Sequence, residues 1–119
     1  MNKDQLKLRT KKFALDIIMF VEALPKQGKT TEIIGRQLLR SGTSVGSNYR
    51  AACRARSSAD FVAKMGIVEE ELDESIYWLE LLVDSGMISS DGAASLAKET
   101  DELLAITVSS ITTAKRNSR

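Results

Sequence analysis

The sequence predicts an all-α fold, an up-down-up-down antiparallel four-helix bundle. Apolar residues recur at spacings of three and four in four successive segments of the 119-residue chain, which is the pattern of amphipathic helices. The breaks between these segments are short and hold residues that end or begin helices, such as Pro25, Ser57 and Gly86. Short connections between long amphipathic helices are typical of antiparallel bundles. The composition does not change along the chain, so residues 1–119 are expected to form one domain.

The first two segments differ in how clearly they predict a helix. The first is LKLRTKKFALDIIMFVEAL, residues 6–24, and Pro25 ends it. The second begins at Thr30 or Thr31, but SGTSVGSN, residues 41–48, weakens the pattern, because each glycine inside a helix costs about 1 kcal/mol relative to alanine. A loop there is therefore the alternative. The positions expected to face the core are Leu6, Phe13, Ile17, Phe20, Val21 and Leu24, followed by Ile34, Leu38, Val45, Tyr49, Ala52 and Cys53.

The third and fourth segments carry an uninterrupted periodicity. The third begins at Ser57 or Ser58 and reads DFVAKMGIVEEELDESIYWLELLVDSG, in which Gly86 is the expected stop. The fourth opens at Ser89 or Ser90 and runs to the polar tail AKRNSR. Their inward positions are Phe61, Met65, Val68, Leu72, Ser75, Ile76, Leu79 and Val83, then Ala93, Leu96, Leu103, Ile106, Ser110 and Ile111.

The residue types present argue against most enzyme classes. The chain has no histidine and one cysteine, so it lacks the usual ligands of zinc and di-iron sites and the usual base of hydrolases. The acidic run EEELDE, residues 69–74, is expected to be a solvated or partner-pairing face, because consecutive acids on a helix point in different directions. Cys53 lies among apolar positions and is expected to be a buried structural thiol. We therefore expect no catalytic residue, no metal site and no cofactor.

The pattern of hydropathy does not predict a membrane protein. The N-terminal sequence MNKDQLKLRTKK has no apolar region of the kind that secretory signals contain. No apolar run approaches the roughly 20 residues that span a bilayer. A cytoplasmic location is expected.

The order of these signals resembles a known family. The successive stretches ALPKQG, LLRSGTSVGSNYRAA and SSADFVAKMGIVEEELDESIYWLELLVDSGMIS resemble the bacterial four-helix-bundle proteins encoded in intervening sequences of large-subunit ribosomal RNA genes. The same family includes the accessory variability proteins of diversity-generating retroelements. The resemblance implies a four-helix bundle that assembles as a ring-like homopentamer. For the retroelement members it also implies a basic surface that binds nucleic acid and a reverse transcriptase.

The chain departs from the common family pattern in the second segment. Many members have a proline where Gly46 stands, and they continue Asn-Ile-Ala-Glu-Gly where this chain reads Asn48, Tyr49, Arg50, Ala51 and Ala52. Loss of an acid and gain of an arginine make this segment more basic than the family pattern.

The second segment also carries a candidate nucleic-acid-binding face. Five arginines and no lysine lie between Gly35 and Ser58. At about 100° per residue, four of these arginines fall within an arc of roughly 80°, opposite the apolar positions, with two small hydroxyl residues between them. Guanidinium groups bind phosphate bidentately, and small residues leave room for a nucleic-acid backbone. The candidate residues for binding RNA or DNA are Arg36, Arg40, Thr43, Ser47, Arg50 and Arg54.

A different class of function would use the same arginines. The third segment is rich in acids, and antiparallel helices can bring opposite charges together, so the arginines could pair within the protomer or across a subunit boundary. A structural or adaptor protein that binds an acidic protein partner is therefore the alternative to a nucleic-acid-binding module. The sequence leaves both open.

Three apolar residues of the third segment predict an oligomer. Trp78 lies about 100° from the main apolar stripe and groups with Ile67 and Leu81 on an otherwise charged helix. A monomer would expose this strip, so burial against another subunit is expected, with coverage of Trp78 by the fourth helix as the alternative. Together with the resemblance, the strip predicts a homo-oligomer, a pentamer.

Overall fold

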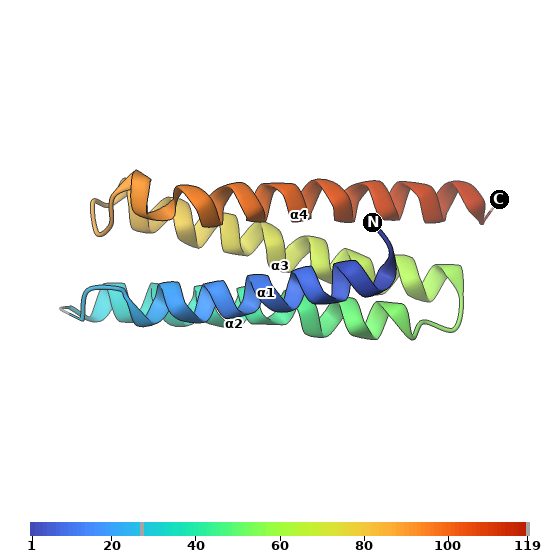
Figure 1. Cartoon of the computed structure of the whole chain (residues 1–119), viewed down its shortest axis with the longest axis horizontal. Coiled ribbons are helices and arrows are strands. Elements are labelled where there is room, and N and C mark those ends of the chain that lie inside the picture. Colours follow the sequence, from blue (N-terminus) through green and yellow to red (C-terminus); the bar gives the residue numbers. More distant parts are fainter. Residues whose placement is uncertain (27, 119) are drawn as a thin grey trace.

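The computed structural model describes residues 1–26 and 28–118 and confirms the all-α fold (Figure 1). The four helices are α1 (Lys3–Glu22), α2 (Lys29–Cys53), α3 (Ser58–Asp84) and α4 (Ser90–Asn117). Figure 1 shows that they alternate in direction, so that both termini lie at one end of a bundle that measures 51 × 21 × 19 Å. In the part of the chain that the structure describes, none of these helices has the length and apolarity needed to cross a membrane.

Polar residues and a glycine cap the N-termini of the helices, and two of these four caps were predicted. Asn2 caps α1, because its side chain accepts a hydrogen bond from the backbone N–H of Gln5, whose own side chain accepts from the N–H of Asn2. Ser57 and Ser89 cap α3 and α4 as predicted. α2 begins at Lys29, slightly before the expected threonines, and Gly28 adopts φ of 93° at its N-cap position.

The glycine-containing stretch 41–48 is helical, so the loop alternative is wrong. Its glycines face α1 and allow the two helices to approach closely. A Cβ atom on Gly42 would lie 2.7 Å from Cγ1 of Ile17, and one on Gly46 would lie 3.4 Å from the backbone oxygen of Thr10. The helix propensity lost at these glycines is therefore offset by packing of α2 against α1.

The apolar core runs through the bundle and contains residues from every helix. The deepest predicted positions are buried, among them Phe13, Ile17, Leu38, Leu72 and Leu103. The prediction omitted Leu82, which is fully buried, and five buried serine and threonine side chains: Thr10, Thr31, Ser41, Thr100 and Thr107. Ser75, which is also buried, was predicted.

The helices pack in chain order, and α1 shares the least contact with α4. An ion pair reinforces this last contact. A side-chain nitrogen of Arg9 lies 2.6 Å from Glu99 and 3.5 Å from Glu102. These carboxylates raise the pKa of Arg9, mainly through the hydrogen bond to Glu99.

Candidate nucleic-acid interface

The structure divides the predicted arginine face into two parts. In the first part the guanidinium groups are paired with acids. Arg36 lies 2.6 Å from Glu32, one turn earlier in α2, and Arg40 lies 3.2 Å from Glu71 and 3.0 Å from Glu74 of α3. The hydrogen bond to Glu74 is the main reason why the pKa of Arg40 is raised. Arg40 thus holds α2 against α3.

The second part lies over the junction of α1 and α2. Arg50 and Arg54 line a groove there together with Lys7 and Lys11 of α1, and Ala14 and Gly46 contribute small surfaces to it. We name this site the basic groove and define it by Lys7, Lys11, Thr43, Ser47, Arg50 and Arg54. Among the described residues, none of its four cationic side chains takes part in an ion pair. No acidic residue lines the groove, so its positive charges are available to an anion.

The two hydroxyl residues of the basic groove have a smaller chemical role than the sequence suggested. The hydroxyl of Thr43 donates to the backbone oxygen of Leu39 at 2.7 Å, and that of Ser47 donates to Ser44 at 3.1 Å. Because their protons are already used within α2, these side chains contribute small size rather than ready hydrogen-bond donors.

The sequence reasoning did not identify Lys7 and Lys11 as site residues. They follow Lys3 at intervals of four, so a lysine row on one side of the first helix is visible in the sequence. That row becomes part of the site because glycine packing sets α1 close beside α2. Arg50 lies in the final turn of α2, and Arg54 directly follows its last residue. Both therefore lie C-terminal to Gly46, where α2 comes closest to Thr10 of α1.

The acidic run, residues 69–74, and the lone cysteine both take part in packing contacts between or within helices. Two acids of the run, Glu71 and Glu74, pair with Arg40. Within the described residues, no group of three or more potential ligands is arranged to hold a metal ion. Cys53 is half-buried rather than buried, and it lies beside Tyr49, whose pKa is raised chiefly by burial.

Comparison with known proteins identifies the family. Residues 4–109 match the 23S rRNA-intervening sequence proteins. The chain belongs to this family. A solved structure, of a protein with unknown function from the S23 ribosomal protein family of Bacteroides thetaiotaomicron, is 33% identical, with a TM-score of 0.85 over 94% of this chain and 99% of that chain. No curated protein matches the sequence.

This 23S rRNA-intervening sequence protein places Gly46 and Arg50 at the basic groove. Gly46 lines the groove next to Thr10, and Arg50 supplies one of its four cations.

The strip predicted as an oligomer contact is only partly exposed. Trp78 is half-buried and packs against the protomer's own core, so the expectation that a single chain exposes it is wrong. It lies four residues after Glu74 and seven after Glu71, which places it on the side of α3 that faces α2. Ile67 and the neighbouring Tyr77 are exposed, and Leu81 is half-buried. The role of the strip in assembly stays a prediction.

Proposed function

We propose that this 23S rRNA-intervening sequence protein is a non-catalytic, homo-oligomeric module that binds nucleic acid through the basic groove. The observation that supports the proposal is the convergence of Lys7, Lys11, Arg50 and Arg54 on one groove that no acidic residue lines. Surface cations are commonly paired or scattered, and Arg36 and Arg40 of the same chain are paired. A cluster without acids retains its positive potential for a polyanion.

The chemistry of the groove favours phosphate over base recognition. The two guanidinium groups can each donate two hydrogen bonds to one phosphate, and the two ammonium groups act as point charges. No aromatic residue lines the groove, so base stacking does not contribute there. Binding is therefore expected to tolerate changes in sequence and to weaken with salt, whether the ligand is RNA or DNA.

Assembly would increase the affinity of such a small site. One basic groove contacts a few phosphates, whereas several copies in a homo-oligomer act on the same strand at high effective concentration. We also propose a pentamer that acts in the cytoplasm with a retroelement reverse transcriptase as a protein partner, because the sequence resembles the retroelement members described above. The alternative is an adaptor that binds an acidic protein surface, for which the cations of the basic groove, unpaired among the described residues, are equally suited.

A pair of double variants tests the site. Arg50→Gln with Arg54→Gln removes two cations from the basic groove, while Lys98→Gln with Lys115→Gln removes the same charge from α4, whose residues do not line it. The readout is fluorescence anisotropy of a labelled 20-nucleotide RNA and the matching DNA at low salt. The groove variant should bind at least about tenfold more weakly, since hydrogen bonds to charged groups contribute about 1.5–3 kcal/mol each.

The control variant should retain near wild-type affinity in the same titration. Equal losses in the two variants would show that only net charge matters and would contradict the proposed site. Absence of wild-type binding to RNA and DNA at low salt would favour the adaptor alternative.

A further inference from the structure

The end of the bundle that holds both termini is open beside the start of α1. This helix has 20 residues against 25 to 28 in the other three, and Figure 1 shows that it begins short of the ends of α3 and α4. The pocket that lies there has a volume of about 320 Å³ and is lined by residues from all four helices. We name it the notch and define it by Lys3, Cys53, Arg56, Ser57, Ser58 and Phe61.

The notch is positively charged. Lys3 and Arg56 supply two cations, and among the described residues neither takes part in an ion pair. The nearby carboxylate of Asp60 does not line the notch, because it pairs with Lys64 at 2.6 Å and accepts from the backbone N–H of Arg56 at 3.4 Å. The hydroxyl oxygen of Ser57 accepts from the backbone N–H of Asp60, so its own proton is free to be donated. The notch therefore presents cations and a hydroxyl donor to an anion.

The notch continues the positive surface of the basic groove. Lys3 lies one turn before Lys7 on α1, and Arg56 follows Arg54 by two residues. At Lys3 this surface turns from the junction of α1 and α2 to the end of the bundle, where residues of α3 and α4 also line it. A chain of phosphates that follows both sites must therefore bend at Lys3.

The notch differs from the basic groove because it holds an aromatic side chain. Phe61 is half-buried, so that part of it packs against the core and part of it lines the notch. Unpaired bases stack on such rings, whereas the bases of a duplex already stack on one another. A duplex also resists a sharp turn, since its persistence length is about 50 nm. Both the bend and the ring favour a strand with unpaired bases.

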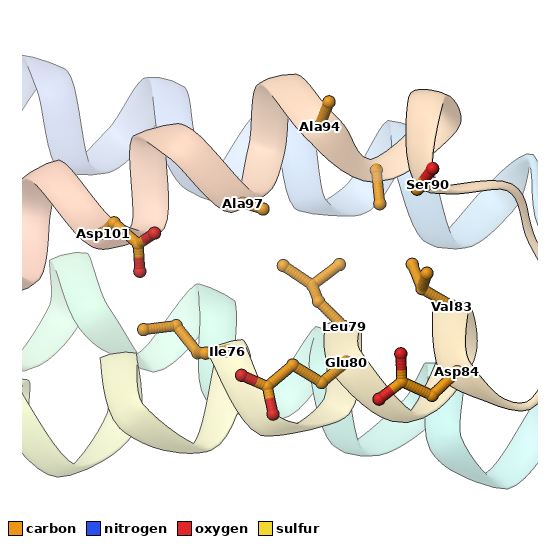
Figure 2. A pocket seen from close by; sticks show the side chains of 10 residues that line it. Ile76, Leu79, Glu80, Val83, Asp84, Ser90, Ala94, Ala97 and Asp101 are labelled. Carbon is orange, nitrogen blue, oxygen red and sulfur yellow. The ribbon is translucent and has the colours of Figure 1, made fainter.

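The half of the bundle farther from the termini has the opposite charge. A groove between α3 and α4 there carries Glu80 and Asp84 on the α3 side and Asp101 on the α4 side (Figure 2). In the described part of the chain, none of these three carboxylates takes part in an ion pair. Charge is thus separated along the bundle, and the field directs a polyanion toward the end that holds the notch.

We propose that the notch binds an unpaired nucleotide of a single-stranded RNA or DNA whose backbone lies in the basic groove. Lys3 and Arg56 contact the phosphate of this nucleotide, and its base stacks on Phe61. This inference rests on the proposed function and narrows its ligand from nucleic acid in general to single strands and unpaired segments.

Two variants of the notch test the inference by anisotropy with the 20-nucleotide RNA and DNA, each as a single strand and as a duplex with its complement. Lys3→Gln with Arg56→Gln removes the cations, and Phe61→Leu removes the ring but keeps an apolar side chain. Each should weaken binding of the single strand by at least about fivefold and of the duplex by less than about twofold, because a stacked base or a hydrogen bond to a charged group is lost only from the strand. Lys29→Gln with Lys98→Gln, at two exposed lysines that line neither site, should alter neither affinity.

The single cysteine of the chain reports occupancy of the notch directly. Cys53 is half-buried and lines the notch, so iodoacetamide should alkylate it in the free protein, as followed by mass spectrometry. A saturating single strand should slow this reaction severalfold in the wild type, and a saturating duplex should not. Notch variants that weaken strand and duplex equally, or a Cys53 that reacts at the free rate under a saturating strand, would overturn the inference and leave the basic groove standing. Absence of wild-type binding to any of these nucleic acids would overturn both.

Discussion

Ser41 of α2 and Ser75 of α3 face each other inside the bundle, with their hydroxyl oxygens 2.8 Å apart and neither side chain exposed. The Ser75 hydroxyl also lies 2.8 Å from the backbone oxygen of Glu71, and the Ser41 hydroxyl lies 3.3 Å from that of Leu38. Either hydroxyl can therefore donate to the other while its partner donates to the backbone. The pair satisfies two polar groups that would otherwise be buried without partners. It also fixes the register of the two helices at the level where Arg40 meets Glu71 and Glu74.

Replacement of Ser41 by alanine should destabilise the protein by about 1 kcal/mol, the usual net contribution of a hydrogen bond. Urea denaturation would measure the change, with Ser109→Ala on the exposed side of α4 as the control. Adding Ser75→Ala should cost less in the Ser41→Ala background than in the wild type, because the shared bond is already lost. Additive effects of the two substitutions would show that the hydroxyl pair does not couple α2 to α3.

Two glycine-to-alanine substitutions should change stability in opposite directions. At Gly42 the new Cβ would lie 2.7 Å from Ile17, and such overpacking costs about 1–3 kcal/mol, more than the helix propensity gained. At Gly66, inside α3, nothing lies within 4 Å of a new Cβ, so Gly66→Ala should stabilise by about 1 kcal/mol. Thermal denaturation of the two variants checks both signs. Stabilisation by Gly42→Ala would show that α1 does not pack tightly on this glycine.

The fold was predictable because its signals are local. The caps at Ser57 and Ser89 and the three- and four-residue spacing of apolar groups depend only on nearby sequence. The stretch 41–48 was ambiguous for a physical reason. A glycine lowers helix propensity in the same way whether it marks a loop or, like Gly42, makes room for a neighbouring helix.

The candidate site was predictable only in part, because its composition depends on which helices are neighbours. Helical spacing placed Arg40 and Arg50 on one face. In the structure, Arg40 pairs with two acids of α3, whereas Arg50 lines a groove together with two lysines of α1. Lys7 and Lys11 join the site only through the packing of α1 on α2. Trp78 was expected to be exposed because it lies about 100° from the main apolar stripe of its helix, yet it is half-buried and packs against the core.

The dependence of nucleic-acid affinity on salt tests the basic groove most directly. Each phosphate that a cation neutralises contributes about 0.7 to 0.9 to the slope of log K against log salt concentration, so loss of one contact lowers the slope by about 1. Titrating the same labelled RNA at four salt concentrations should give a slope that is shallower by about 2 for Arg50→Gln with Arg54→Gln than for the wild type. The Lys98→Gln with Lys115→Gln control should keep the wild-type slope. A groove variant whose slope equals that of the wild type would contradict phosphate binding in the basic groove.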